Sequence, residues 1–263
     1  MKNKSVPFLL TIDIGNSHTV IGIFEGEQLR HHWRIQTDRR NTADEIAATL
    51  HSLFVMAQCS PSSIDGVIIA SVVPQLHGSW LTFCRTMVAK PILVDHETPT
   101  GIRVLIDNPS EVGADRLVNA AAGFHRYRQA LIIVDFGTAI TFDCVSSQGE
   151  YLGGAIAPGM GIAIEALGSR TAKLPRVDID CPPPKAIGTN TVAAIQSGIL
   201  HGYGGLVEGL LQRLKAQIAP QKPLVIATGG MAQLIAPYAP SLEKIEPHLT
   251  LEGLRLIYDR CHA

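Results

Sequence analysis

Three short stretches of the chain place carboxylates beside glycines and hydroxyl residues, a pattern suited to phosphate chemistry. In the first, "TIDIGNSHTV" (residues 11–20), Asp13 ends an apolar strand, and Gly15 and Asn16 follow. A sharp turn after a strand points successive N–H groups outward, and glycine lets a phosphate come close. A carboxylate there can hold a cation that bridges phosphate oxygens. Because single Asp-x-Gly turns are common, this stretch alone predicts only a phosphate-compatible turn.

The second stretch repeats the first. Residues 131–141, "LIIVDFGTAIT", again run an apolar strand into an Asp-x-Gly turn, and aligning Asp135 with Asp13 places Gly137 on Gly15, 122 residues apart. Such a spacing, close to half of the chain, indicates two similar halves. We therefore expect two facing turns that clamp a polyphosphate and its metal.

The third stretch is "NPSEVGADRLVNAAAGF", residues 108–124. Its Pro109 and Ser110 are typical of a helix start, which would put Asp115 and Arg116 in the first turns of that helix. A carboxylate at this place is favoured by the helix dipole even without a function. The functional alternative is that Asp115 takes a proton from a substrate hydroxyl while Arg116 binds an anionic group.

Several familiar motifs are missing from the sequence. It contains no GxxxxGK[ST] phosphate loop and no HExxH or CxxC metal spacing, and "GMGIAI" (159–164) lacks the third glycine of a dinucleotide motif. A nucleotide must therefore be held in another way. Gly229 and Gly230 after "VIAT" either pack against an adenine or ribose or simply form a strand-end turn.

Strands alternate with helices along both halves, which predicts an α/β fold with mixed sheets flanked by helices. We expect domains at residues 1–128 and 129–263, with the last helix free to pack back on the first domain. The predicted strands are 8–12, 20–24, 65–74, 131–135 and 223–228, and "FGTAIT" (136–141) is predicted as a turn that leads into a further strand. Polar turns, including "EGEQ" and "SSQGEYLGG", join them. The predicted helices are 41–57, with a Thr42/Glu45 capping box, 109–124, 191–218 and 249–261. We expect the glycines of the 191–218 helix to allow close packing.

Composition argues against a nucleic-acid-binding, membrane or secreted protein. The formal net charge of −1 gives no field that attracts nucleic acid or an anionic membrane, and the basic "RRN" after Asp38 is expected to be a solvated loop. The N-terminal apolar run is cut by Asp13 before it reaches the length of a signal peptide, and residues 186–207 make a poor membrane span. The five cysteines are scattered and odd in number, so we expect a reduced, cytoplasmic protein.

At these residues the sequence resembles a type III pantothenate kinase, a family of the acetate and sugar kinase, Hsp70 and actin superfamily. Six stretches carry the resemblance, occur in the family's order and span nearly the whole chain. They are "DIGNS" (13–17), "NPSEVGADR" (108–116), "DFGTAIT" (135–141), "GGAIAPGMG" (153–161), "GTNTVAAIQSGI" (188–199) and "ATGGMA" (227–232). The pair "GADR" and "DFGTA" is specific, whereas any single stretch is not.

The resemblance implies two ribonuclease-H-like domains around a cleft and ATP-dependent phosphorylation of pantothenate, the first step of coenzyme A synthesis. It implies that Asp115 is the catalytic base, that Asp13 lies near Mg²⁺ and that Asp135 binds a monovalent cation, K⁺ or NH₄⁺. The implied ATP-binding residues are Asp13, Ile14, Gly15, Asn16, Ser17, His18, Thr19, Val20 and Thr138. The implied pantothenate-binding residues are Gly113, Ala114, Asp115, Arg116 and Thr191. Members of the family are homodimers with a shared pocket, to which the mostly apolar 153–167 segment, charged only at Glu165, is expected to contribute.

Two positions depart from the family pattern. Ser17 stands where the family often has Thr, and the hydroxyl is kept. Ile106 stands where the family commonly has a substrate-facing Tyr, which removes one expected pocket contact but not the chemistry.

Two rival functions stay open at the level of sequence. A kinase of the same superfamily for a sugar or a carboxylic acid is one, although the Cys-rich zinc motif of one large sugar-kinase branch is missing. A non-catalytic nucleotide-binding regulator is the other, although such a protein would not need Asp115.

Overall fold

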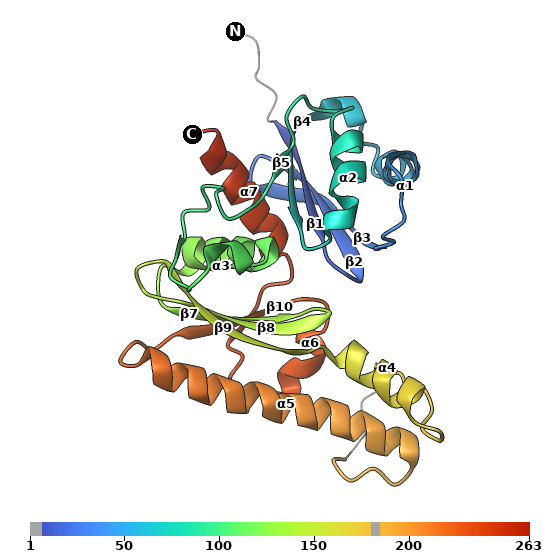
Figure 1. Cartoon of the computed structure of the whole chain (residues 1–263), viewed down its shortest axis with the longest axis vertical. Coiled ribbons are helices and arrows are strands. Elements are labelled where there is room, and N and C mark those ends of the chain that lie inside the picture. The colour runs from blue at the N-terminus through green and yellow to red at the C-terminus, as the bar shows by residue number, and fades with distance from the viewer. Residues whose placement is uncertain (1–6, 180–184) are drawn as a thin grey trace. The chain divides into compact units, whose positions relative to one another are not determined.

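The computed structural model describes residues 7–179 and 185–263, so the N-terminal stretch considered as a signal peptide lies partly outside the described residues. Contacts divide the chain into two compact units. Unit 1 holds residues 1–102, 107–122 and 249–263, and unit 2 holds residues 103–106 and 123–248. The domain boundary expected after residue 128 stays a prediction. Figure 1 labels the helices and most strands of both units, each of which is described by itself below.

Unit 1 is built on a mixed sheet with the strand order β3-β2-β1-β4-β5. β2 is antiparallel to β1 and β3, whereas β4 runs parallel to β1 and to β5. The strands are β1 (Phe8–Ile14), β2 (His18–Glu25), β3 (Gln28–Gln36), β4 (Ile64–Ser71) and β5 (Ile92–Leu93). The carboxyl ends of β1 and β4 therefore meet at one edge of the sheet.

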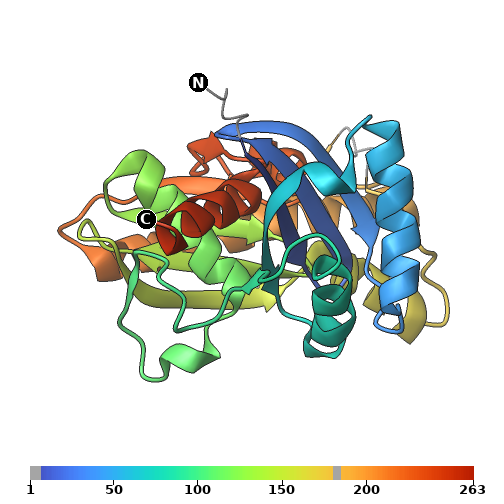
Figure 2. The same cartoon turned by 90° about the horizontal axis from the view of Figure 1, so that it is seen from above.

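Alternate residues of β1 face opposite sides of this sheet, and each side has its own helices (Figure 2). Leu10 and Ile12 pack with α1 (Ala43–Met56) and α2 (His77–Cys84). Leu9 packs with α3 (Ala114–Tyr127) and α7 (Leu249–Cys261). The C-terminal helix α7 thus belongs to the core of unit 1.

The start of α1 is confirmed where the sequence predicts it. The Thr42 hydroxyl accepts from the Glu45 N–H, and the Glu45 carboxylate accepts from the Thr42 N–H at 2.8 Å, which completes the capping box. Short 3-10 turns precede β4 at Pro61–Ser63 and α2 at Pro74–Leu76.

Unit 2 repeats the strand arrangement of unit 1. Its sheet has the order β11-β10-β7-β8-β9-β6, so β9, β8, β7, β10 and β11 correspond to β3, β2, β1, β4 and β5. Parallel and antiparallel pairings also match. The strands are β6 (Arg103–Val104), β7 (Leu131–Phe136), β8 (Ala139–Val145), β9 (Glu150–Pro158), β10 (Leu224–Thr228) and β11 (Lys244–Ile245). Two mixed, ribonuclease-H-like sheets flanked by helices confirm the predicted α/β fold class.

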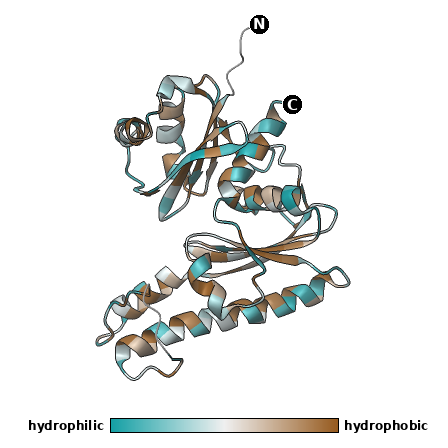
Figure 3. Ribbon diagram, turned by 180° about the vertical axis from the view of Figure 1, so that it is seen from behind, coloured by the Kyte–Doolittle hydropathy of each residue, from teal (hydrophilic) through white to brown (hydrophobic). Residues whose placement is uncertain are grey.

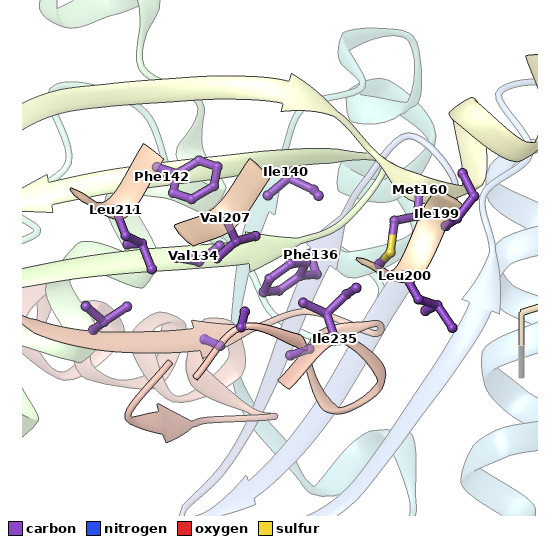
Figure 4. Packing of buried hydrophobic residues seen from close by; sticks show 14 of the residues in the cluster. Val134, Phe136, Ile140, Phe142, Met160, Ile199, Leu200, Val207, Leu211 and Ile235 are labelled. Atoms are coloured by element: carbon purple, nitrogen blue, oxygen red, sulfur yellow. The ribbon is translucent and has the colours of Figure 1, made fainter. Parts of the chain in front are cut away.

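One face of the unit 2 sheet is covered by α5 (Thr191–Ile218), together with α4 (Met160–Arg170) and α6 (Ala232–Ile235). Val134 and Phe136 of β7 point to this side and meet Leu200, Val207 and Leu211 of α5 (Figure 4). Hydropathy varies along α5, with hydrophobic and hydrophilic bands (Figure 3), as expected of a helix with one buried side. A last 3-10 turn follows α6 at Ala236–Tyr238.

The helix predicted from Pro109 begins later than expected. Pro109–Glu111 forms a separate 3-10 turn capped by the Asn108 side chain. The extended backbone of Val112 (φ −73°, ψ 125°) ends this turn and separates it from the α-helix. The α-helix then starts at Ala114. The predicted helix start was therefore wrong, yet Asp115 still falls in the first helical turn.

Five strands were missed in the sequence: β3, β9 and the two-residue strands β5, β6 and β11. β3 was left undescribed because its outward residues are polar, and most of β9 was assigned to a turn because it contains Gly153 and Gly154, residues that disfavour strands. Gly154 is required there, since a Cβ at this position would lie 1.6 Å from the Phe142 carbonyl oxygen.

The glycines of α5 serve different purposes. Only Gly204 is in tight backbone contact, because a Cβ there would lie 2.3 Å from the Tyr238 carbonyl oxygen. Around Gly198, Gly202 and Gly205 nothing described lies within 4 Å of such an atom. The expected close packing therefore holds at one position and is wrong at these three. In the part of the chain that is described, no helix is both long and apolar enough to cross a membrane.

Candidate functional site

The first Asp-x-Gly turn closes the antiparallel pair of β1 and β2. Asp13 pairs with Val20, and the Gly15 N–H donates to the His18 carbonyl oxygen at 3.0 Å. Asn16, Ser17 and His18 form the exposed tip, whereas Thr19 is buried. The polar side chains that the sequence singled out therefore lie at the solvent end of a rigid hairpin.

The side chain of Asp13 projects from the face of the sheet that α3 covers. Residues two apart in a strand share a face, so Asp13 lies on the side of Leu9, which packs with Ala114 and Val118 of α3. Asp13 also pairs with Ala70 near the carboxyl end of β4. Ligands of open α/β sheets bind beyond the carboxyl ends of the strands, and Asp13 stands at that edge.

The "GADR" stretch lies at the same edge of unit 1. A Cβ on Gly113 would stand 3.5 Å from Val72 Cγ1, and the Val72 N–H donates to the carbonyl oxygen of Ile14 at 3.0 Å. Gly113 is thus next to the ends of β1 and β4. Within unit 1 the fold brings the start of α3 beside the first turn, although 100 residues separate the two in the sequence.

Asp115 folds back over the start of its own helix. Its Oδ1 accepts from the Arg116 N–H at 2.8 Å and would lie 2.6 Å from a Cβ on Gly113. Asp115 and Arg116 are half-buried, whereas Ala114 is buried against the core. A carboxylate held against bare backbone at a helix start is stabilised in its ionised form by the helix dipole.

His18 at the tip of the first turn is held by an arginine of β3. Arg34 Nη2 lies 3.0 Å from His18 Nδ1. Because a guanidinium can only donate, Nδ1 is the acceptor and the imidazole is neutral. Partial burial, together with the positive charge of Arg34, lowers the pKa of His18.

The second Asp-x-Gly turn, in unit 2, is enclosed by backbone. Asp135 pairs with Thr141 of β8 and Thr228 of β10, at the carboxyl edge of parallel β7 and β10. Gly229 follows with φ +89°, and a Cβ there would lie 2.4 Å from Asp135 Oδ1 and 2.6 Å from the Phe136 nitrogen. Only glycine fits this position. Gly229 therefore forms a turn that fits against Asp135.

Thr138 continues the enclosure on the other side of the same turn. Its carbonyl oxygen accepts from the Gly159 N–H at 3.1 Å and would stand 2.2 Å from a Cβ on Gly159. The Tyr203 hydroxyl of α5 donates to the Pro158 carbonyl oxygen at 3.1 Å. In the sequence Gly159 stood out only as part of "GMGIAI" and of a family stretch, and its close approach to Thr138 is a tertiary feature with no local signal.

Thr191 lies apart from the second turn within unit 2. It is the first residue of α5, exposed, just after the cap in which Asn190 Oδ1 accepts from the Ala193 N–H. Twelve residues separate Thr191 from Tyr203, which corresponds to about 18 Å along the helix axis. Asp135, moreover, projects from the sheet face opposite to the one that α5 covers, since its neighbours Val134 and Phe136 face α5.

The departure at Ile106 also falls in unit 2. Ile106 Cγ2 would contact a Cβ on Gly153 at 3.4 Å, so its side chain lies against β9.

As for metals, no cluster of three or more His, Cys, Asp or Glu side chains suited to an ion occurs among the residues described. The carboxylate of Asp13 is a ligand of the kind that Mg²⁺ uses in kinase sites beside phosphate oxygens and water.

A comparison with known proteins decides the family. Residues 9–213 match the model of the type III pantothenate kinases. The chain belongs to the type III pantothenate kinase family. A relative of that name from Desulfatibacillum aliphaticivorans is 50% identical over 253 residues, covering 96% of this chain and 98% of the relative. The resemblance found at the motifs is thereby confirmed, and the matched range contains every expected site residue, although "ATGGMA" lies beyond it.

Solved structures of distant proteins share the fold. Component A of (R)-2-hydroxyglutaryl-CoA dehydratase from Acidaminococcus fermentans has a TM-score of 0.59 at 12% identity and covers 98% of this chain and 100% of its own. A ROK family glucokinase from Streptomyces griseus, solved with glucose and AMPPNP, has a TM-score of 0.50 at 12% identity and covers 96% of this chain and 99% of its own. At these identities the likeness concerns the fold of this kinase family and not its substrate.

Proposed function

We propose that the protein transfers the γ-phosphoryl group of ATP to pantothenate and forms 4′-phosphopantothenate, the first step of coenzyme A synthesis. One observation carries the proposal beyond family membership. Asp13, at the end of β1, projects toward the face of the unit 1 sheet where α3 begins with Asp115. A cation-binding carboxylate and a candidate base thus belong to the same edge of one sheet, as phosphoryl transfer requires.

The first turn is the proposed phosphate site. Its tip residues Asn16 and Ser17 are exposed donors, and Gly15 keeps the backbone accessible. In this proposal residues Asp13 to Val20 line the ATP phosphates, and Asp13 holds Mg²⁺ together with them. The bound Mg²⁺ would supply neutralisation of the phosphate charge.

Asp115 is the proposed general base. Its carboxylate lies against Gly113, where the missing side chain makes room for the carboxylate itself, and it is half-buried at the start of α3. A positioned base of this kind typically contributes about 10²–10⁴ in rate. Ala114 and Arg116 would complete this side of the pantothenate pocket, with Arg116 as the partner of an anionic group.

The second turn is the proposed monovalent cation site. Asp135 contributes a carboxylate, and the same turn carries the backbone oxygens of Gly137 and Thr138, which lie against Gly159. Carboxylate and carbonyl oxygens are the ligands that hard cations such as K⁺ accept. The same turn would place Thr138 against ATP. A bound K⁺ or NH₄⁺ would add positive charge to the nucleotide site.

A homodimer fits the position of Thr191. Its distance along α5 from the second turn supports a role in a pocket shared between two subunits. The outer side of β9 and the following helix carry exposed apolar side chains, Leu152, Ile156 and Ile162, which favours burial against a second copy. We place this dimer in the cytoplasm, without nucleic acid or membrane partners, on the basis of charge and cysteine usage.

A phosphorylation assay tests the proposal. The chain is incubated with ATP, Mg²⁺ and K⁺ and a panel of hydroxyl acids that includes pantothenate, and products are identified by mass. Phosphopantothenate is the expected product. A preference for a sugar or another acid would favour the rival kinase, and nucleotide binding without any product would favour the regulator.

Replacing Asp115 tests the base. Asp115→Asn should lower kcat about 10²- to 10⁴-fold while ATP still binds, because the amide keeps the shape but cannot accept the proton. Asp107→Asn is the matched control, since Asp107 is an exposed acid in the segment before α3. A near-normal kcat in Asp115→Asn would show that the base lies elsewhere.

A further inference from the structure

A segment after β3 is tied along the first turn. The Thr37 N–H donates to the Ser17 carbonyl oxygen at 3.0 Å, and the hydroxyls of Thr37 and buried Thr19 are 2.9 Å apart. Residues 37–42, which we name the strap, then lead into α1. Two hydrogen bonds therefore fix the start of the strap against the hairpin tip that the proposed function assigns to phosphate.

Arg39 of the strap orients the amide of Asn16. Its Nη2 donates to Asn16 Oδ1 at 2.9 Å. Because a guanidinium has donors only, the oxygen of the amide must face Arg39, and the NH₂ group of Asn16 must point away from it. An exposed amide at the tip of the turn is thus held with its donor side outward, which suits a phosphate oxygen.

The neighbouring Arg40 differs from Arg39 because an acid neutralises its charge. Its Nε and Nη2 donate to the two oxygens of Asp38 at 3.1 and 2.9 Å, and these bonds hold the pKa of Asp38 at about 2. Arg39 bonds to a neutral amide instead and forms no ion pair with any acid in the described residues. One of two adjacent guanidinium charges is therefore neutralised, and the other is left beside the turn.

We propose that Arg39 is a positioning residue for the nucleotide, which holds the Asn16 amide as a donor and adds an uncompensated positive charge next to the phosphates. This inference rests on the proposed function, because it needs a polyphosphate at the first turn. A charge within the Debye length of about 8 Å is still felt at physiological salt. Arg39 acts on affinity for the charged nucleotide and not on the proton transfer, which takes place at Asp115.

Matched variants of the two arginines test the inference. Arg39→Gln should raise KM for ATP about 5- to 20-fold with kcat within about twofold and KM for pantothenate unchanged. Arg39→Lys keeps the charge without the planar fork and should recover part of the affinity. Arg40→Gln should leave all three parameters unchanged. Thermal unfolding of each variant establishes that the comparison is between folded proteins.

Two further measurements distinguish a role of Arg39 in orienting Asn16 from a purely structural role. The Kd of the Mg²⁺ complex of the non-hydrolysable ATP analogue AMPPNP, measured by calorimetry at low and high salt, should depend less on salt in Arg39→Gln than in the parent. In an Asn16→Ala background the same substitution should raise Kd by a smaller factor, because the two residues act as one unit.

The inference is overturned if Arg39→Gln and Arg40→Gln change KM for ATP equally, or if neither changes it. Calorimetry keeps this failure distinct from that of the proposed function. A chain that binds the analogue through Arg39 but phosphorylates no pantothenate loses only the proposed reaction, whereas one that binds no nucleotide loses both.

Discussion

The two Asp-x-Gly turns share a backbone plan but differ in what surrounds the carboxylate. The first, after Asp13, ends in exposed side-chain donors and has Arg34 and Arg39 beside its tip. The second, after Asp135, is lined by backbone brought close by Gly159 and Gly229. Donors and guanidinium groups suit an anion, whereas a carboxylate and the carbonyl oxygens of its own turn suit a cation.

The difference shows how a repeated fold takes on two tasks. In both units the carboxyl ends of two parallel strands meet beside the turn, so the repeat supplies the same platform twice. The neighbouring segments then decide the chemistry. In unit 1 a polar edge strand and the strap lie against the turn, and in unit 2 two glycine-containing segments do.

The largest effect that would sharpen this contrast is expected at Gly229. Gly229→Ala forces a side chain into the left-handed region and against the backbone of Phe136, and it should cost roughly 2–6 kcal/mol of unfolding free energy. Gly15→Ala is the matched change in the first turn, where the new Cβ would lie 3.0 Å from the His18 carbonyl oxygen without a positive φ. It should cost about 1 kcal/mol. Urea denaturation measures both, and equal losses would remove the distinction between a backbone-lined and a side-chain-lined turn.

The next effect concerns the ions. In the parent, K⁺ should raise the rate of the proposed kinase at least severalfold. Asp135→Ala should abolish this activation, because the carboxylate of the cation site is gone. Asp13→Ala should instead raise the Mg²⁺ concentration needed for half-maximal rate and keep a K⁺ response. Titrations of initial rate with each ion read out the two behaviours. An unchanged K⁺ response in Asp135→Ala would break the assignment of the second turn.

The smallest effect is a pH dependence confined to the first turn. The pKa of His18 is lowered in the folded state, so on acidification the unfolded chain takes up its proton first. The contribution of His18 to stability should therefore be complete above pH 6.5 and fall as the pH drops below it. His18→Gln keeps an acceptor for Arg34 but removes this titration. Urea unfolding of both proteins at pH 8, 7, 6 and 5 should show a difference that changes only in the acidic range, and a constant difference would contradict it.

Local patterns predicted the elements whose signals are contained in a short segment. The bounds of α5 were predicted in full, and the capping box of α1 was confirmed, because periodicity and cap residues act within a few turns of chain. Errors arose where strand pairing or a local backbone conformation overrides propensity. β9 is a strand despite two glycines because it pairs with β8, and Pro109 starts a separate turn because Val112 adopts an extended backbone.

Site residues follow the same division. Asp13, Asp115 and Asp135 were selected from sequence alone, since a carboxylate beside glycine is a local pattern, and the motifs identified the family. The sequence passed over the strap, expecting "RRN" to be a solvated loop, because nothing local connects Arg39 with Asn16.

The sequence by itself therefore determined the family, the repeated strand-turn-strand units and the types of the chemical groups. Only the tertiary structure decided which of these groups are neighbours. It turned Asp13 toward the start of α3 and placed Gly229 against Asp135. Among the described residues it gave Arg40 an acidic partner and Arg39 a neutral amide. The physical reason is that strand pairing and helix packing fix distances between residues far apart in the chain, whereas composition and spacing constrain only the residues within one element.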